Sequence, residues 1–147
     1  MLRTALIQAA SLALGIATIP AAHGADAVAP LTRVGDSYTV PITFGGKSAP
    51  CMVDTGADFV VIPAPWVHAG AGGWVSGKLM YMRNAEGTTR AHHSGTMTLA
   101  VGSAELRVPV LLGDAGTDCL LGQSFLARFR SVTFDYAGKR LILGGTS

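Results

Sequence analysis

An Asp-Thr-Gly tripeptide joins two short apolar runs in the segment Cys51-Met52-Val53-Asp54-Thr55-Gly56-Ala57-Asp58-Phe59-Val60-Val61-Ile62. The length and composition of both runs are typical of buried strands, and Thr55-Gly56 would form the tight loop between them. A carboxylate at such a position costs free energy unless it is hydrogen-bonded, paired or used in a reaction. Asp, Thr and Gly are also common turn residues, so the tripeptide alone leaves open whether Asp54 has a structural or a chemical role.

A second element lies downstream, in Cys119-Leu120-Leu121-Gly122-Gln123-Ser124-Phe125-Leu126, where an apolar pair runs into a glycine and a short helix. Together with Asp54-Thr55-Gly56-Ala57-Asp58, this element resembles the retropepsin-like aspartic proteases, the single-domain family that includes the retroviral proteases. The form Leu-Leu-Gly-x-Ser-Phe-Leu, followed by Arg128-Phe129, is similar to the bacterial exported branch of that family. The resemblance extends from about Tyr38 to Leu143, and two motifs in the family's order make it far more specific than Asp-Thr-Gly alone.

The remaining sequence has the patterns of short β-strands rather than of helices. We expect hairpins around Gly45-Gly46, around Gly102-Ser103 and around residues 135–138. One short helix is expected over 124–129, and no regular structure longer than a turn between residues 64 and 76. This pattern predicts an all-β fold. The resemblance implies a closed β-barrel, in which a hairpin of residues 79–83 and 88–92 is the flap over the substrate.

Hydrolysis of a peptide bond by carboxylates requires two of them around one water. One carboxylate is ionised and takes the proton of the water, and the other is protonated and polarises the carbonyl group. Two adjacent carboxylates achieve this by sharing one proton. The chain contains a single Asp-Thr-Gly, and its other acidic residues lie in turns or loops or directly after the motif. A two-fold homodimer in which each copy contributes Asp54 is the simplest solution, and the resemblance implies the same assembly.

The resemblance also implies roles for the residues around this carboxylate. Asp54 would be catalytic, Thr55 would bridge the loops of the two copies, and Gly56 would let the backbone approach the carboxylates closely. The substrate-binding residues would lie beside this loop, at the flap tip and at the end of the second motif: Ala57, Asp58, Asn84, Ala85, Glu86, Gly87, Leu121 and Gly122. We expect no metal or other cofactor, since His68, His92 and His93 lack the spacing of metal ligands.

Two features leave alternatives open. Retroviral members of the family have an arginine after the Leu-Leu-Gly equivalent, where it pairs with the acid at the position of Asp58 and braces the dimer. This chain has Gln123 there, which leaves the strength of the dimer open. In the family fold the strands that carry Cys51 and Cys119 run close together, so a disulfide is one hypothesis and two buried thiols are the other.

The N-terminus has the pattern of a secretory signal peptide, because Met1-Leu2-Arg3 precedes an apolar run over residues 5–19 and then small residues. Cleavage after Gly24 or after Ala27 satisfies the small-x-small rule. The alternative is an uncleaved inner-membrane anchor over residues 5–22, although about 20 apolar residues are needed to span a bilayer. The expected organisation is a signal peptide (1–24), a flexible lead-in (25–36) and one protease domain (37–147) that is periplasmic or secreted.

Composition narrows the functional classes further. Hydrophobic residues make up 49% of the chain and charged residues 14%, with no cluster of Lys and Arg, so nucleic acid is not an expected partner.

The predicted function is an aspartic endopeptidase that acts as a homodimer on peptides or unfolded proteins. The alternative is a non-catalytic peptide-binding or dimerisation module on the same fold. The intact Asp-Thr-Gly argues against that alternative, because binding alone does not require the carboxylate.

Overall fold

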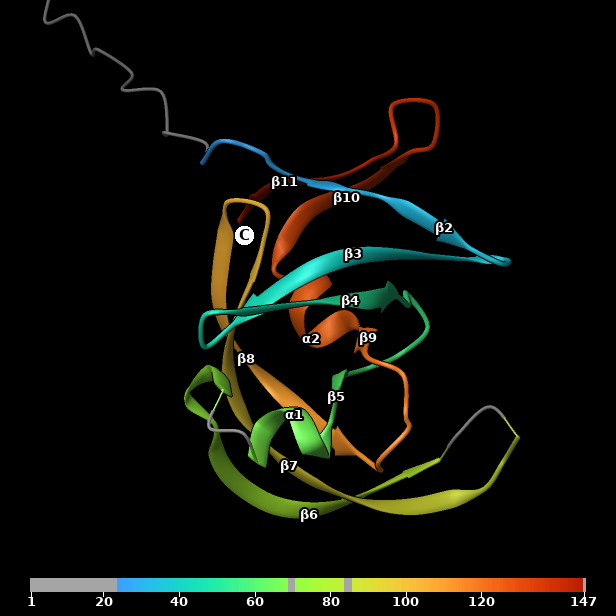
Figure 1. The fold of residues 1–147 in the computed structure, drawn as a ribbon, viewed down its shortest axis with the longest axis vertical. Helices are drawn as coiled ribbons and strands as arrows, with labels where there is room; N and C mark the ends of the chain where they lie inside the picture. The colour runs from blue at the N-terminus through green and yellow to red at the C-terminus, as the bar shows by residue number, and fades with distance from the viewer. Residues whose placement is uncertain (1–23, 69–70, 84–85, 147) are drawn as a thin grey trace, which may run out of the picture.

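The computed structural model describes residues 24–68, 71–83 and 86–146 and shows a β-barrel with two short α-helices (Figure 1). The helices are α1 (Ala64–His68) and α2 (Gln123–Leu126), and η1 (Ala71–Gly73) is a short 3-10 helix. The strands are β1 (Ala27–Pro30), β2 (Thr32–Val34), β3 (Ser37–Phe44), β4 (Lys47–Val53), β5 (Val60–Pro63), β6 (Val75–Arg83), β7 (Thr89–Val101), β8 (Ala104–Gly113), β9 (Leu120–Leu121), β10 (Phe129–Asp135) and β11 (Arg140–Thr146).

The barrel closes through a single additional pairing. Eight strands form one sheet in the order β2-β3-β4-β9-β5-β8-β7-β6. β3 also pairs with β7, at Thr43 and Ala100, and this pairing joins β3, β4, β9, β5, β8 and β7 into a ring. A second sheet, in the order β1-β11-β10, lies across one end of the barrel (Figure 1). The predicted all-β fold is confirmed.

The two sequence motifs meet in the barrel wall at β9. This strand contains only Leu120 and Leu121, and it runs parallel to β4 with Met52 in register with Leu120. Its other edge pairs antiparallel with β5, where Val61 is in register with Leu120. Because β9 lies between β4 and β5, the loop that joins those strands is fixed at both ends, and this loop begins with Asp54.

The hairpin predicted around Gly45-Gly46 is present and joins β3 to β4. The φ angles of Gly45 and Gly46 are 53° and 77°, in the left-handed region that a two-residue type I′ turn requires at both positions. Glycine adopts this region without the steric cost of a Cβ atom. The turn therefore fixes the register of β4 and, with it, the position at which Asp54 leaves the strand.

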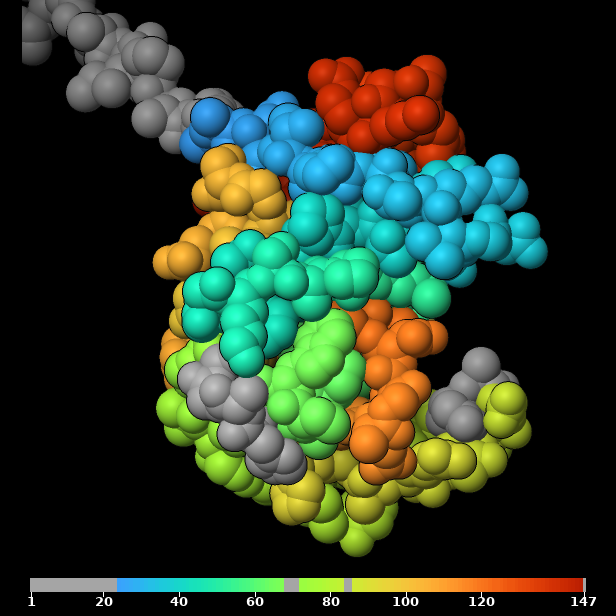
Figure 2. Space-filling model, in the orientation of Figure 1, coloured from blue at the N-terminus to red at the C-terminus, as the bar shows by residue number. Residues whose placement is uncertain are grey.

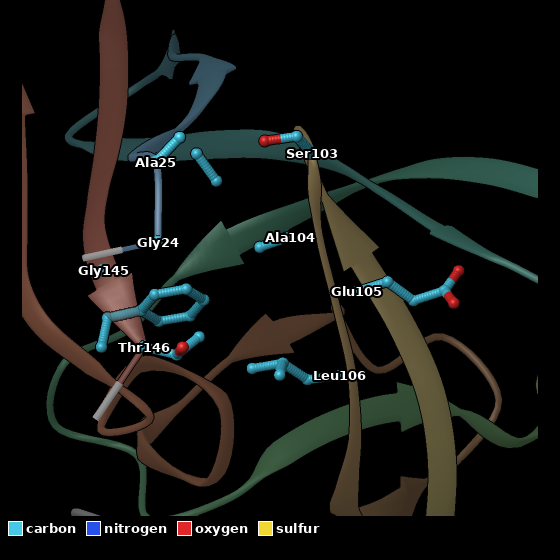
Figure 3. Close-up of a pocket in the computed structure, with 10 residues that line it drawn as sticks. Gly24, Ala25, Ser103, Ala104, Glu105, Leu106, Gly145 and Thr146 are labelled. Carbon is cyan, nitrogen blue, oxygen red and sulfur yellow. The ribbon is translucent and has the colours of Figure 1, made fainter. Parts of the chain in front are cut away.

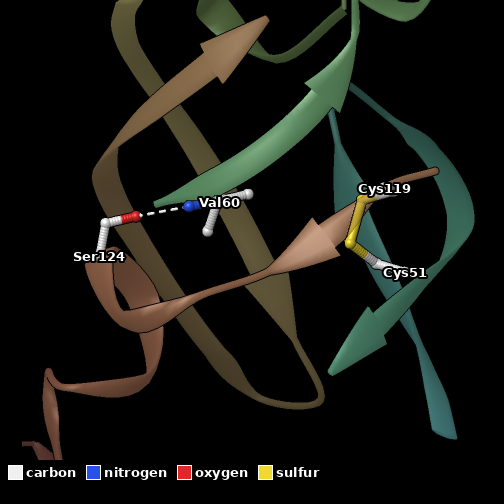
Figure 4. The surroundings of a disulfide bond; sticks show 4 residues. All are labelled: Cys51, Val60, Cys119 and Ser124. Carbon is white, nitrogen blue, oxygen red and sulfur yellow. Dashed lines mark hydrogen bonds between the residues drawn. A yellow bond between two sulfur atoms is a disulfide. The ribbon is translucent and has the colours of Figure 1, made fainter. Parts of the chain in front are cut away.

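Cys51 and Cys119 form a disulfide, with sulfur atoms 2.04 Å apart, which joins β4 to the residue before β9 (Figure 4). Both cysteines are buried in the hydrophobic core, together with Leu121 and Phe125. The bond spans 68 residues of sequence. In the chain-entropy account, closing a loop of that length destabilises the unfolded state by about 4 kcal/mol.

The predicted flexible lead-in over residues 25–36 is wrong, because this segment contains β1 and β2. β1 pairs antiparallel with β11, and its side chains alternate, with Ala27 and Ala29 buried and Val28 exposed. Alanine contributes little apolar signal to a sequence pattern, so the alternation was not recognised. Residues 1–23, which contain most of the predicted signal peptide or anchor, lie outside the described residues. Within the described ranges no helix has the length and hydrophobicity to span a membrane.

The expectation of one short helix is also wrong, since α1 forms where no regular structure was expected. Pro65 is the second residue of α1, and proline is tolerated in the first turn of a helix because the amide it lacks has no partner there. The ring of Trp66 stacks on Phe44, with centroids 5.7 Å apart. This contact anchors α1 to the core.

The predicted flap hairpin is present but longer than expected. β6 begins at Val75, and β7 is one continuous strand of 13 residues where two separate strands were expected. The first half of β7 pairs with β6 and the second half with β8. The flap is therefore a direct extension of the barrel wall.

Candidate active site

Asp54 lies at the C-terminal end of β4, half-buried, and its orientation is fixed by hydrogen bonds at both main chain and side chain. Its backbone N–H donates to the Leu121 carbonyl at 3.2 Å. Its Oδ1 accepts the Gly56 N–H at 2.9 Å, and its carbonyl accepts the Ala57 N–H at 3.3 Å. No described residue donates to Oδ2, so one carboxylate oxygen is held and the other is available.

The second motif supports this loop from behind through three backbone contacts. The Gln123 N–H donates to the Ala57 carbonyl at 2.8 Å, and the Ser124 N–H donates to the Asp58 carbonyl at 2.9 Å. A Cβ atom at Gly122 would lie 2.3 Å from the Phe59 carbonyl oxygen, so only glycine allows so close an approach. The loop and the start of α2 are thus packed backbone to backbone.

Two side chains complete this support. The Ser124 hydroxyl accepts the Val60 N–H at 2.9 Å (Figure 4) and donates to the Pro109 carbonyl at 2.7 Å, which links α2 to β5 and β8. The Gln123 side-chain amide donates to the Thr55 carbonyl at 2.7 Å. The residue that replaces the family's arginine therefore contacts the Asp-Thr-Gly loop of its own chain.

A cleft of about 630 Å³ opens above Asp54 and separates the loop from the β6–β7 hairpin. Figure 2 shows the hollow between this hairpin and the rest of the domain. The residues that line the cleft come from the Asp-Thr-Gly loop, β5, both flap strands, β8, the loop after β8, and β9: Asp54, Gly56, Ala57, Asp58, Phe59, Val61, Met82, Arg83, Arg90, His92, Leu111, Asp114, Thr117 and Leu120.

Polar contacts along the flap wall of the cleft are few. An Arg90 guanidinium nitrogen lies 3.8 Å from Asp114 Oδ2, an exposed ion pair between the flap and the loop after β8. The Arg83 Nε donates to the Gly87 carbonyl at 3.2 Å near the tip of the hairpin. His92 Nδ1 lies 3.0 Å from the Leu112 carbonyl. Because a carbonyl only accepts, Nδ1 carries the proton in this bond, and in the neutral ring Nε2 is an acceptor.

The structure places the site residues predicted from the sequence in three groups. Asp54, Gly56, Ala57 and Asp58 line the cleft, whereas Thr55 is exposed beside it. Leu121 and Gly122 are buried behind the loop and do not line the cleft, whereas Leu120 does. Glu86 and Gly87 are exposed near the flap tip and do not line the cleft, while Asn84 and Ala85 lie outside the described residues.

Several cleft residues were not predicted, and most come from the flap and the loop after β8. Arg90 and His92 are two positions apart on β7, so their side chains lie on the same face of the strand. That alternation was available from the sequence. The contribution of Asp114 and Thr117 was not, because it depends on how the loop after β8 folds back toward β5.

A second hollow, of about 240 Å³, lies where the start of β1, the start of β8 and the end of β11 meet (Figure 3). Glu105 is the only ionisable side chain among the described residues that line it, and Figure 3 shows the Glu105 carboxylate pointing away from Gly24 and Gly145. This hollow does not include Asp54. The cleft beneath the flap is therefore the better candidate for an active site.

Comparison with known proteins agrees with this geometry. Residues 40–128, more than half of the chain, match the family model described as gag-polyprotein putative aspartyl protease. The fold is similar to a solved retropepsin-like aspartic protease from Rickettsia conorii, with a TM-score of 0.56, 22% sequence identity, and coverage of 84% of this chain and 93% of that one. A search of curated proteins gave no match. The retropepsin-like fold is thus confirmed, and the chain belongs to the retropepsin-like aspartyl protease family that this family model describes.

Proposed function

We propose that this protein is an aspartic endopeptidase in which Asp54 from two copies activates one water. The observation that carries the proposal is the geometry of Asp54: its Oδ1 is held by the Gly56 N–H at 2.9 Å, while Oδ2 has no donor among the described residues and the side chain lines the cleft. A fixed carboxylate with one available oxygen at the base of a cleft suits proton transfer to and from a water.

A homodimer supplies the second carboxylate. Asp58 and Asp114 also line the cleft, but neither of their carboxylates accepts a backbone N–H from any described residue, so neither is held as Asp54 is. A two-fold axis beside the loop would bring two identical Asp54 side chains together. Two adjacent carboxylates share one proton, which provides the ionised and the protonated group that the reaction needs.

The reaction then proceeds by general acid–base catalysis. The ionised carboxylate takes a proton from the water, whose oxygen attacks the carbonyl carbon of the scissile amide, while the protonated carboxylate hydrogen-bonds to the carbonyl oxygen. A proton then passes to the leaving nitrogen as the C–N bond breaks. The substrate binds extended between the loop and the β6–β7 hairpin, which closes over it and excludes water.

We also propose that the protein is exported, with cleavage after Gly24. Cleavage after Ala27 would remove a buried residue of β1, whereas cleavage after Gly24 leaves β1 whole. The Cys51–Cys119 disulfide suits an oxidising compartment. N-terminal sequencing of the protein recovered from the periplasm or the medium is expected to begin at Ala25. Recovery of the full chain in the membrane would instead indicate an anchor over residues 5–22.

The test of the proposed activity is digestion of an unfolded protein at a series of pH values between about pH 4 and 7. Asp54→Asn should lower the rate by at least about 100-fold. Asp36→Asn is the matched control, because it removes the same charge from an exposed turn, where the Asp36 carboxylate pairs with Arg33 at 3.6 Å and with no other described residue. Equal activity of the protein and Asp54→Asn would end the proposal, and tight peptide binding without turnover would support the non-catalytic alternative.

The dimer is tested separately by sedimentation, with and without a peptide-like inhibitor of aspartic proteases. A two-fold active site requires the inhibitor to bind one molecule per two chains and to shift the population toward the dimer. Inhibitor binding to a monomer would show that Asp54 of a single chain forms the site alone.

A further inference from the structure

The Asp58 carboxylate lines the cleft four positions after Asp54, and no described residue is its counter-ion. The residue is exposed, and among the described residues its side chain takes part in no hydrogen bond or ion pair. Each of the other charged groups in the cleft, apart from Asp54 itself, has a contact: Arg90 with Asp114, and Arg83 with the Gly87 carbonyl.

The backbone that carries this charge is held in place by hydrogen bonds. The Asp58 carbonyl accepts the Ser124 N–H at 2.9 Å, and the preceding carbonyl, of Ala57, accepts the Gln123 N–H at 2.8 Å. Asp58 therefore belongs to the same supported loop as Asp54. A charged residue on a rigid loop selects a ligand more strongly than one on a mobile loop, because less conformational entropy of the loop is lost when the ligand binds.

The residue that stands where the family has an arginine does not neutralise Asp58. Gln123 is uncharged, and its side-chain amide donates to the Thr55 carbonyl at 2.7 Å instead of to the Asp58 carboxylate. The lining of the cleft contains three carboxylates and two guanidinium groups, so it carries an excess of negative charge.

We propose that Asp58 determines substrate specificity by selecting a lysine or arginine side chain of the bound peptide. This inference rests on the proposed function, since it concerns the substrate of the same cleft. A cation of the peptide would supply the partner that the Asp58 carboxylate lacks. Closure of the flap would shield this pair from water, and a charge-assisted hydrogen bond is stronger when it is shielded in this way. We expect a preference of about tenfold for a basic over an acidic residue at one position near the scissile bond.

The experiment is digestion of a mixed peptide library, followed by mass spectrometry of the products to count the residues that flank each cut. The protein is expected to enrich Lys and Arg at one flanking position. Asp58→Asn should lose that enrichment, and Asp58→Lys should replace it with enrichment of Asp and Glu. Asp36→Asn, which removes the same charge at a distance, should keep the enrichment. An unchanged preference in Asp58→Asn would overturn the inference while leaving the proposed activity intact.

A second measurement separates this inference from the proposed activity. Two fluorescent peptides that differ only in a central Lys-Arg or Glu-Glu pair are titrated with the protein and with Asp58→Asn, and binding is followed by anisotropy. The basic peptide should bind about tenfold more tightly to the protein, and Asp58→Asn should remove the difference. If no library peptide is cut, the proposed activity fails, and these titrations alone decide the role of Asp58. Equal binding of the two peptides would overturn it.

Discussion

The Gln123 side-chain amide donates a hydrogen bond to the Thr55 carbonyl oxygen at 2.7 Å, between two residues that are 68 positions apart in the sequence. This bond connects the start of α2 directly to the Asp-Thr-Gly loop. The absence of the family's arginine therefore does not leave the loop without support in the described structure. A neutral amide takes part of the bracing role within one chain.

Replacement of Gln123 should weaken the loop according to the chemistry of the new side chain. Gln123→Ala removes one hydrogen bond and should lower the free energy of unfolding by about 1 kcal/mol. Gln123→Glu should cost more, because a carboxylate would face the Thr55 carbonyl oxygen with no donor. Urea denaturation and peptidase rate should show the same order. Equal stability of Gln123→Glu and the unmodified protein would contradict the role of this bond.

Gly122→Ala should be among the most destabilising small substitutions in the chain. The new Cβ would lie 2.3 Å from the Phe59 carbonyl oxygen and 2.7 Å from that of Ala57, so the loop must move away from α2. Gly46→Ala is a suitable comparison, because its Cβ would have no neighbour within 4 Å and only the positive φ of 77° opposes it. We expect a cost of about 1 kcal/mol for Gly46→Ala and more than about 3 kcal/mol for Gly122→Ala. Similar melting temperatures would refute the tight packing.

Loss of the Cys51–Cys119 disulfide should destabilise the domain by up to about 4 kcal/mol, since the bond closes a long loop. The Cys51→Ala/Cys119→Ala double variant and the reduced protein should melt at similar temperatures, both well below the oxidised protein. The reductant should have no effect on the double variant, which serves as its control. Detection of two free thiols in the unreduced protein would contradict the disulfide.

The alternation of β1 can be tested with one pair of substitutions. Ala29 is 1% exposed and Val28 is 46% exposed. Ala29→Asp would bury an unpaired carboxylate and should cost at least about 3 kcal/mol, whereas Val28→Asp should be tolerated within about 0.5 kcal/mol. Thermal melting of the two variants compares the same chemical change on the two faces of one strand. Equal losses of melting temperature in the two variants would mean that β1 does not pack against the core.

Asp135 and Arg140 provide a pH-dependent contribution to stability. The hydrogen bond from Arg140, at 2.6 Å, and then the bond from the Gly138 N–H lower the pKa of the Asp135 carboxyl below its ordinary value. A lowered pKa stabilises the folded state above the ordinary pKa, and the contribution is lost as the pH falls through the lowered value. Asp135→Asn should therefore reduce the melting temperature at pH 7 more than at about pH 3. The opposite order would contradict this coupling.

The sequence was sufficient for the parts of the fold that depend on local chemistry. Gly45-Gly46 predicted a hairpin because two adjacent residues with positive φ are required there, and Leu121-Gly122 marked the strand end that lies beside Asp54. β1 was missed because its buried positions are alanines, and α1 was missed because a helix of five residues is too short to show a helical period.

The cleft was harder to predict because it is assembled from distant parts of the chain. An Arg90 guanidinium nitrogen and Asp114 Oδ2 lie 3.8 Å apart in its lining, yet no local pattern relates the two residues. Asp58 was placed beside the substrate from the resemblance, and Gln123 already indicated that the family's arginine is absent, but the bond from the Gln123 amide to the Thr55 carbonyl required the structure. The two motifs were enough to locate the Asp-Thr-Gly loop, whereas the charged groups around that loop are set by the tertiary structure.

The insertion of β9 between β4 and β5 has a consequence for the order in which the molecule is built. Pairing Met52 with Leu120 requires nearly the whole domain to have been synthesised, and contacts so distant in sequence form slowly. The carboxylate loop therefore acquires its final geometry only late in folding, after residue 124 is in place. Under the proposed export and activity, a nascent chain still threaded through a translocation channel would carry Asp54 without the scaffold that aligns it, and it would become competent for proteolysis only after export.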